Sequence, residues 1–146
     1  LWHGDAAYWG RRSPVLFPIV GSLKNKEYRY EGKTYPMSQH GFARDMEFTM
    51  TDHTEDTIWL QLLATEETLA KYPFQFKLEI GYQLIDRALK VMWKVTNEDQ
   101  KEMHFSIGGH PAFNCPLHKG ERFEDYKIVF DEKMTKSILR PDHPLW

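Results

Sequence analysis

The chain has 146 residues, of which 41% are hydrophobic and 27% are charged, and its formal net charge is −2. This length fits one domain, and this composition supplies a packed core and excludes wholesale disorder. The small net charge argues against nucleic-acid and acidic-membrane partners, and no apolar stretch is long enough to cross a bilayer. Cys115 is the single cysteine, so no internal disulfide can form, and a reducing compartment such as the cytoplasm is expected.

The first third of the chain predicts short segments separated by turns. Residues 14–21 form an apolar run bracketed by Pro14 and Pro18. Because proline cannot donate a hydrogen bond to a β-ladder, this run predicts a buried irregular or edge segment. Residues 27–30 and 34–35 flank Glu31-Gly32-Lys33, an arrangement typical of a small hairpin.

The middle of the chain predicts two strands followed by a helix. Residues 47–51 and 57–63 are rich in strand-forming side chains, and residues 65–72 are the single helical candidate. Thr65 can cap this helix and Pro73 can end it, which predicts a helix of about two turns.

Alternation of apolar and polar residues is the clearest pattern in the chain. It runs from Phe74 to Leu84 and resumes over residues 89–95 after a turn at Asp86-Arg87. A period of two predicts strands with one buried face and one wet face. Further short strands are expected at residues 126–130 and 135–139. A meander of this kind predicts an all-β protein with an antiparallel β-sandwich fold.

Two histidines are the candidate catalytic residues. Alternating apolar residues at 103–107 predict a strand that leads into Gly108-Gly109, and Pro111 then holds His110 extended. His40 is also followed by a glycine. An imidazole near its ordinary pKa of about 6.5 can give or take a proton at neutral pH. The alternative is a loop histidine bonded to a backbone carbonyl. Only a long-range β fold could bring the two rings together.

Other common catalytic patterns are missing from the sequence. The seven histidines show no His-x-His or His-Glu-x-x-His spacing, and there is no cysteine pair, which argues against a metal site. The glycines Gly108-Gly109 are not followed by the Gly-Lys-Ser/Thr of a phosphate loop. No Gly-x-Ser-x-Gly is present to carry a hydrolase serine.

Side chains suited to a sugar occur near both histidines. Those that could stack on a sugar ring or bind its hydroxyls are Trp9, Phe113, Asp5 and Asn114. Arg12 and Arg44 could clamp an anion or hydroxyls through the fork of the guanidinium. The alternatives are core packing for the tryptophan and surface ion pairs for the arginines, for example Arg44 with Asp45.

Three phrases together resemble the aldose 1-epimerase (galactose mutarotase) superfamily. They are Phe17-Pro18-Ile19-Val20-Gly21, His40-Gly41-Phe42-Ala43-Arg44 and Gly109-His110-Pro111-Ala112-Phe113-Asn114. The likeness is strong to the LacX-like branch, where residues 1–5 and 9–11 add to it, and it runs to about Leu117. The resemblance implies a galactose mutarotase-like supersandwich that binds sugar on a concave sheet face. It also implies interconversion of the α and β anomers of a free hexose such as galactose or glucose, without a cofactor.

The resemblance also implies residue roles. In the family's mechanism a carboxylate removes the proton of the C1 hydroxyl while a histidine protonates the ring oxygen. By position in the motifs, His110 resembles the histidine that protonates the ring oxygen, and His40 resembles the one that binds and polarises beside it. Arg44 stands where a sugar-phosphate-specific relative has a phosphate-binding arginine.

The sequence departs from the family pattern at two points. Ser22 stands where many relatives carry a substrate-binding arginine, so recognition is expected to depend on Arg12 or Arg44. The family's catalytic glutamate has no matching motif here, and Asp5 is the nearest substitute. We therefore expect residues 1–146 to be one mutarotase-like domain, an N-terminal portion incomplete at both ends. The alternative functions are a non-catalytic carbohydrate-binding module on the same fold and a hexose-6-phosphate 1-epimerase.

Overall fold

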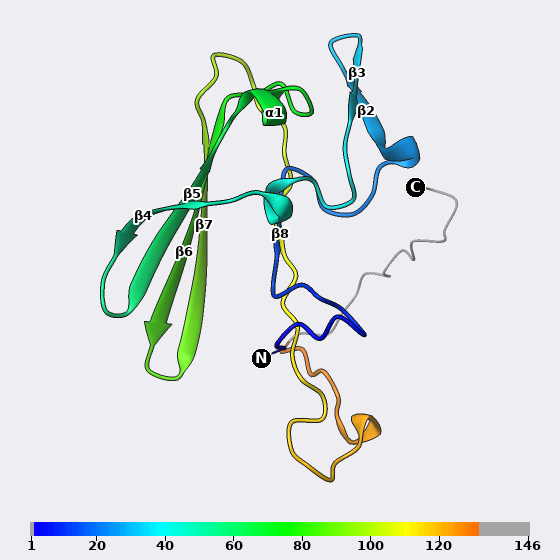
Figure 1. Cartoon of the computed structure of the whole chain (residues 1–146), viewed down its shortest axis with the longest axis vertical. Helices are drawn as coiled ribbons and strands as arrows, with labels where there is room; N and C mark the ends of the chain where they lie inside the picture. Colours follow the sequence, from blue (N-terminus) through cyan, green and yellow to red (C-terminus); the bar gives the residue numbers. More distant parts are fainter. Residues whose placement is uncertain (1, 132–146) are drawn as a thin grey trace. The chain divides into compact units, whose positions relative to one another are not determined.

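The computed structural model describes residues 2–131 (Figure 1). The chain consists of two compact units. One unit is residues 15–108, and the other joins the N-terminal residues up to 14 with the residues from 109 onward. Most regular structure in the described residues is β-strand. No helix in this part of the chain has the length and apolar character needed to span a membrane.

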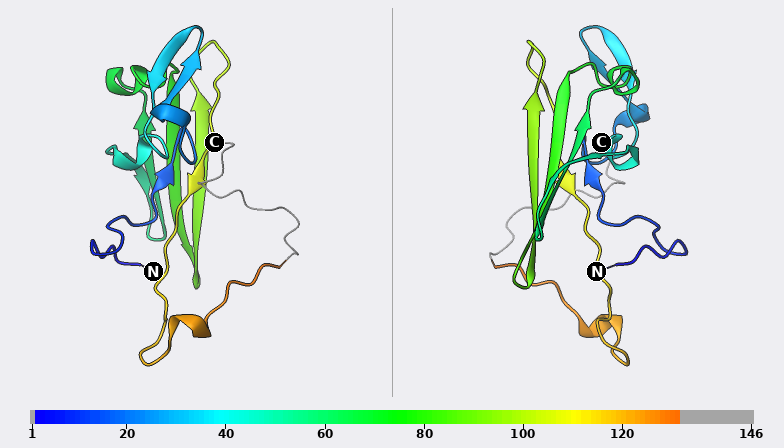
Figure 2. Two further views of the ribbon diagram at one scale, coloured as in Figure 1. Left: turned by 90° about the vertical axis from the view of Figure 1, so that its right-hand side faces the viewer. Right: turned by 60° about the vertical axis from the view of Figure 1, so that its left-hand side comes forward.

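The largest sheet in residues 15–108 is a four-stranded antiparallel meander (Figures 1 and 2). Its strands are, in order, β4 (Thr49–His53), β5 (Thr57–Leu63), β6 (Phe76–Ile85) and β7 (Ala88–Asn97). Leu78 on β6 lies opposite Leu62 on β5 and Val95 on β7. Apolar side chains of three strands therefore share one face, which confirms the strands predicted from the alternation.

The opposite face of this sheet is polar. The carboxylate of Glu79 lies between two lysines, with its Oε2 at 3.6 Å from Lys77 Nζ and 3.1 Å from Lys94 Nζ. The indole of Trp59 covers Gly81, where an added Cβ would lie 2.8 Å from Trp59 Cζ2. The same strands thus carry one apolar face and one mostly polar face.

The smaller elements include the hairpin that the sequence predicts. Strands β2 (Glu27–Tyr30) and β3 (Lys33–Pro36) pair through a turn in which Glu31 and Gly32 have φ of 47° and 78°. Positive φ at both turn residues matches the twist of the flanking strands. Strand β1 (Val15–Leu16) pairs with β8 (Gly108–Gly109). Short 3-10 turns occupy Lys24–Lys26, Ala43–Asp45 and Phe123–Asp125.

The helix is shorter than the two turns predicted. Helix α1 spans Glu66–Leu69, one turn, and Thr65 caps it by accepting a hydrogen bond from the Thr68 N–H at 3.3 Å. The capping prediction is confirmed. The helix stops early because Tyr72 and Phe74 are buried in the core, which requires the chain to extend soon after the first turn.

Two predicted strands are wrong and a third lies outside the described residues. Residues 103–107 form no strand, because Met103 and Ile107 pack on the core while Ser106 bonds to the Pro18 carbonyl rather than to a ladder. Residues 126–130 are irregular, and the exposed fraction of Ile128 is 84%. Strand propensity without a partner strand does not suffice for a strand. The prediction for residues 135–139 lies outside the described part.

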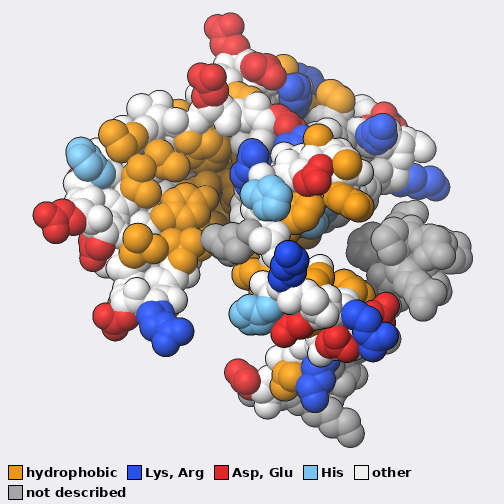
Figure 3. All heavy atoms as spheres, turned by 60° about the horizontal axis from the view of Figure 1, so that its bottom comes forward, with side chains coloured by type: hydrophobic (Ala, Val, Ile, Leu, Met, Phe, Trp, Pro, Cys, Tyr) orange, Lys and Arg blue, Asp and Glu red, His pale blue; other side chains and the backbone are white. Residues whose placement is uncertain are grey.

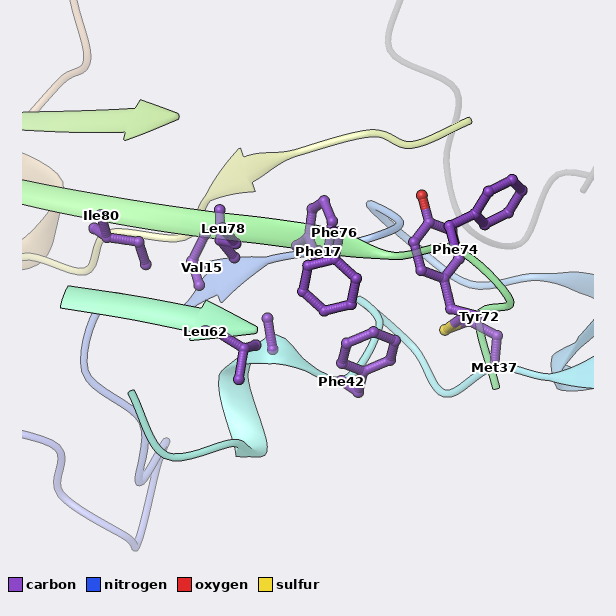
Figure 4. Close-up of a cluster of buried hydrophobic side chains, with 11 residues drawn as sticks. Val15, Phe17, Met37, Phe42, Leu62, Tyr72, Phe74, Phe76, Leu78 and Ile80 are labelled. Carbon is purple, nitrogen blue, oxygen red and sulfur yellow. The ribbon is translucent and has the colours of Figure 1, made fainter. Parts of the chain in front are cut away.

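Aromatic rings form the centre of the core (Figure 4). The ring of Phe17 lies 5.2 Å from that of Phe76, 6.0 Å from Tyr72 and 6.4 Å from Phe42 between centroids. Burial raises the pKa of the Tyr72 hydroxyl, so this group stays protonated and donates a hydrogen bond to the His104 carbonyl at 2.8 Å. The core thus anchors residues 103–107 without a β-ladder.

Residues 17–21, which we call the Phe17–Gly21 segment, are hydrogen-bonded on two sides. The Phe17 carbonyl accepts from the N–H groups of Phe42 at 3.1 Å and Ala43 at 3.2 Å. The Pro18 carbonyl accepts from the Ser106 N–H at 2.9 Å, and Ser106 Oγ accepts from the Val20 N–H at 3.0 Å. The predicted buried irregular segment is confirmed, and it joins two segments far apart in the sequence.

The apolar face of the sheet continues past the core toward the tip of the β6–β7 hairpin. Large apolar side chains there are exposed: the fractions are 61% for Leu84, 49% for Leu89, 45% for Val91 and 42% for Trp93. Figure 3 shows hydrophobic side chains gathered in a patch with charged side chains at its margin. The alternation of apolar and polar residues therefore continues into the part of the sheet where the apolar side chains are exposed.

Replacing Leu78 with alanine should destabilise the fold far more than replacing Leu84. The two leucines share one strand and one face, but Leu78 is 0% exposed and Leu84 is 61% exposed. We expect Leu78→Ala to lower the free energy of unfolding by about 2–5 kcal/mol, and Leu84→Ala by about 0.5–1 kcal/mol. Urea denaturation measures both. Equal losses would contradict the placement of the core.

Replacing Gly41 with alanine should cost more than the same change at Gly32. Both have φ in the left-handed region, 74° and 78°, but a Cβ at Gly41 would lie 2.1 Å from the Phe17 carbonyl oxygen, whereas one at Gly32 meets nothing within 4 Å. Gly32→Ala should cost about 1–2 kcal/mol of left-handed strain. Gly41→Ala should exceed about 4 kcal/mol, because it also forces the two segments apart. Similar unfolding midpoints for the two variants would argue against this close contact.

Candidate functional site

His40 is held by a pair of hydrogen bonds to the Phe17–Gly21 segment. Its N–H donates to the Gly21 carbonyl at 2.7 Å, and the Gly21 N–H donates to His40 Nδ1 at 2.9 Å. The residue lies in the left-handed region with φ of 65° and is half-buried. For a residue with a side chain this backbone conformation is uncommon, so the contacts on both sides of the turn must stabilise it.

The turn that contains His40 leads directly to Arg44. Ser38 Oγ donates to the Gly41 carbonyl at 2.7 Å, and the Gly41 N–H donates to the Ser38 carbonyl at 3.0 Å. Arg44 lies in the 3-10 turn Ala43–Asp45, and its Nε is 3.7 Å from Asp45 Oδ2. The ion pair considered from the sequence is therefore present. The Arg44 side chain is 16% exposed, which leaves little of it open to a ligand.

His110 presents an exposed imidazole beside an indole ring. Its N–H donates to the Pro14 carbonyl at 3.1 Å, which fixes the backbone just after β8. The ring of His110 lies 4.8 Å from that of Trp9 between centroids, with 37° between their planes. Trp9 is held in turn because its carbonyl accepts from Trp2 Nε1 at 2.8 Å. A ligand that contacts the exposed imidazole would therefore also lie near the indole ring.

Asp5 and Arg12 shape the loop that carries Trp9. Asp5 Oδ1 accepts from the Ala7 N–H at 2.9 Å, and the Asp5 carbonyl accepts from the Trp9 N–H at 2.8 Å. Arg12 Nε donates to the His3 carbonyl at 2.8 Å. These contacts assign both charged residues a structural task in the loop, beside the sugar-binding role that the sequence suggests.

Phe113 and Asn114 follow His110 in the same unit. Phe113 is 66% exposed and Asn114 is half-buried. The loop is closed by a hydrogen bond from the Trp2 N–H to the Ala112 carbonyl at 3.1 Å. An exposed phenyl ring is available for stacking on an apolar ligand face.

The predicted site residues thus fall into two groups, one in each unit. Residues 15–108 contain His40 and Arg44. The other unit contains His110 and the residues around it, namely Trp9, Asp5, Arg12, Phe113 and Asn114. That the two imidazoles act on one sugar stays a prediction.

Sequence reasoning did not identify Gly21 as the partner of His40, or Ser106 as the partner of Val20. The bond from Gly21 to His40 joins residues 19 apart, and the bond from Val20 to Ser106 joins residues 86 apart. Nothing local in the sequence encodes such pairs. The glycine at the end of the apolar run, with φ of 90° in the structure, was the one available signal.

The described residues offer no metal centre. Over residues 2–131, no three His, Cys, Asp or Glu side chains gather closely enough to hold a metal ion. A hollow of about 440 Å³ beside Asp45 is lined by acidic and apolar side chains that include Glu47 and Leu62. His40 is not among its lining residues.

Comparison with known proteins gives concordant matches. The model of the family described as aldose 1-epimerase matches residues 1–141. The plasmid and chromosomal forms of Protein LacX from Lactococcus lactis subsp. lactis are each 40% identical over 144 residues, which cover 94% of this chain and 48% of each relative. The chain therefore spans about half the length of the curated relatives it matches.

Solved structures agree with this family. A galactose mutarotase related enzyme from Lactobacillus acidophilus matches with a TM-score of 0.83 and 47% identity, covering 85% of this chain and 41% of that one. A galactose mutarotase-like protein from Lactobacillus casei ATCC 334 matches with a TM-score of 0.76 and 45% identity, covering 81% of this chain and 40% of that one. The β-sandwich predicted from the sequence is confirmed as part of the galactose mutarotase-like fold. The chain belongs to the aldose 1-epimerase family and resembles its LacX-like branch.

Proposed function

We propose that this protein is an aldose 1-epimerase that interconverts the α and β anomers of a free hexose such as galactose or glucose. In this reaction a base takes the proton of the C1 hydroxyl, the bond between C1 and the ring oxygen breaks, and an acid protonates that oxygen. The aldehyde then turns about the C1–C2 bond, and the ring closes on its other face. No redox partner or transferred group is involved.

The observation that supports this proposal best is the exposed imidazole of His110 beside the Trp9 ring. Their centroid distance of 4.8 Å leaves both groups within reach of one small ligand. An indole favours the apolar face of a pyranose, and an imidazole can donate a proton to an ether oxygen at neutral pH. In this proposal His110 is the acid that protonates the ring oxygen.

The energetic demand of the reaction suits such a site. Mutarotation proceeds unaided in water, so the protein must lower the barrier less than a hydrolase does. One general acid or base typically contributes about 10²–10⁴-fold. His110 and a single carboxylate would therefore suffice. The family's glutamate has no matching motif in residues 1–146, and the Asp5 carboxylate already accepts the Ala7 N–H.

The arginine contacts favour a free sugar over a sugar phosphate. Arg12 Nε donates to the His3 carbonyl, and Arg44 lies against Asp45 with little exposure. A phosphate clamp needs guanidinium groups that are presented to the ligand. The small exposure of Arg44 therefore argues against a phosphate clamp that uses both side chains.

Replacing His110 with alanine should remove most of the mutarotase rate. We expect kcat to fall by about 10²–10⁴-fold, because the ring oxygen loses its proton donor. Polarimetry measures the rate on fresh α-D-glucose or α-D-galactose, with the full-length protein as it is expressed in cells. His118, an exposed histidine of the same unit, provides the matched control, and His118→Ala should retain the unaltered rate.

Three outcomes would count against this function. Wild-type protein that gives no rate gain over buffer would contradict epimerase activity. Calorimetric sugar binding without such a gain would instead select the carbohydrate-binding module. A strong preference for glucose 6-phosphate that Arg44→Ala abolishes would select the phosphate-specific enzyme.

Replacing Trp9 with alanine should weaken sugar binding more than it slows the chemical step. The ring supplies a stacking surface, whereas the Trp9 main-chain contacts to Trp2 and Asp5 survive the substitution. We expect KM to rise by about tenfold, equivalent to roughly 1.4 kcal/mol, with Trp9→Phe close to wild type. An unchanged KM in Trp9→Ala would place the sugar elsewhere.

A further inference from the structure

The hydrogen bonds around His40 determine which of its ring nitrogens carries the proton. The Gly21 N–H points at His40 Nδ1 from 2.9 Å, so Nδ1 must supply a lone pair. A neutral imidazole has one N–H and one acceptor nitrogen. A proton on Nδ1 would set two N–H groups against each other, and a flipped ring would set the Gly21 N–H against a C–H. The contact therefore selects the tautomer with its proton on Nε2.

The backbone holds this arrangement from both sides. The His40 N–H donates to the Gly21 carbonyl at 2.7 Å, so the same two residues exchange two hydrogen bonds. Both His40 and Gly41 have left-handed φ, and Gly41 lies directly against the Phe17 carbonyl. A strained conformation that surrounding contacts hold in place is a common feature of positions whose side chain must be oriented for function.

We propose that Gly21, through its main-chain N–H, is a positioning residue that fixes His40 as an Nε2–H donor toward an ether or hydroxyl oxygen of a pyranose. His40 then donates a hydrogen bond without exchanging its proton. This assignment rests on the proposed epimerase function. The tautomer itself follows from the contacts of His40 and is independent of that function.

Nuclear magnetic resonance tests the tautomer directly on the wild-type protein. With uniform ¹⁵N labelling, imidazole correlation spectra at about pH 8, where a histidine of ordinary pKa is neutral, should show a protonated Nε2 and an unprotonated Nδ1 in His40. A scalar coupling across the hydrogen bond should join the Gly21 amide nitrogen to His40 Nδ1. A protonated Nδ1 would overturn the proposal. Because this test uses only wild-type protein, its result does not depend on whether a variant folds.

Two substitutions test the donor role, because each keeps one end of the imidazole. In His40→Asn the side-chain oxygen can accept the Gly21 N–H near the place of Nδ1, and asparagine tolerates left-handed φ. In His40→Gln the amide nitrogen can take the place of Nε2–H. We expect His40→Asn to keep the Gly21 amide signal but lose about 10²-fold in kcat on α-D-galactose. His40→Gln should stay at least about tenfold faster than His40→Asn.

The remaining outcomes separate this proposal from the proposed function. Wild-type kcat in His40→Asn, or equal loss in both variants with the fold intact, would overturn the donor role. If wild-type protein neither binds nor epimerises the sugar, the proposed function fails and the donor role fails with it. The nitrogen coupling would in that case still assign the tautomer.

Discussion

Hydrogen bonds to the Phe17 carbonyl hold the turn that carries His40 against the core of residues 15–108. This carbonyl accepts two N–H groups, from Phe42 and Ala43, while the ring of the same residue is fully buried among aromatic side chains. The carbonyl and the ring therefore fix the same residue from the backbone side and from the core side. Because an added Cβ at Gly41 would lie 2.1 Å from this oxygen, the turn that carries His40 requires a glycine at this position. The next residues of the Phe17–Gly21 segment bind Ser106, four positions before His110 in sequence.

The fold was most predictable where one physical signal dominated. Alternation defined β6 and β7 because a sheet with one buried face imposes a period of two. The same signal misled at residues 103–107, where Met103 and Ile107 alternate because they pack on the core and not because a ladder holds them. The alternation did not predict that Leu84 and Val91 would be exposed. Their burial depends on whether another part of the chain packs on the apolar face of the sheet. The helix is shorter than predicted because Tyr72 and Phe74 are buried in the core.

Motifs identified the candidate residues, but the sequence could not show what holds each one. His110, Trp9 and Phe113 emerged from the sequence as chemistry-bearing side chains, and the structure adds that His110 and Trp9 lie ring against ring. Asp5 and Arg12 were predicted to bind the sugar, and the structure adds contacts of both residues within their own loop. The bond between Gly21 and His40 Nδ1 was beyond reach, because no local pattern encodes a contact between two turns. The individual candidate residues can be identified in the sequence, whereas the residues that they contact are determined by the folded chain.

The two candidate histidines have different surroundings. His40 is half-buried and bonded through Nδ1 to the backbone, which suits a fixed donor, while His110 is exposed beside an indole, which suits proton exchange with a ligand. The most direct measurement is a titration of the histidine-labelled protein with D-galactose, followed by the ring signals of each histidine. We predict that the ring signals of His110 move on addition of the sugar while those of His118 stay in place. Unchanged His110 signals would contradict the proposal that this imidazole contacts the sugar.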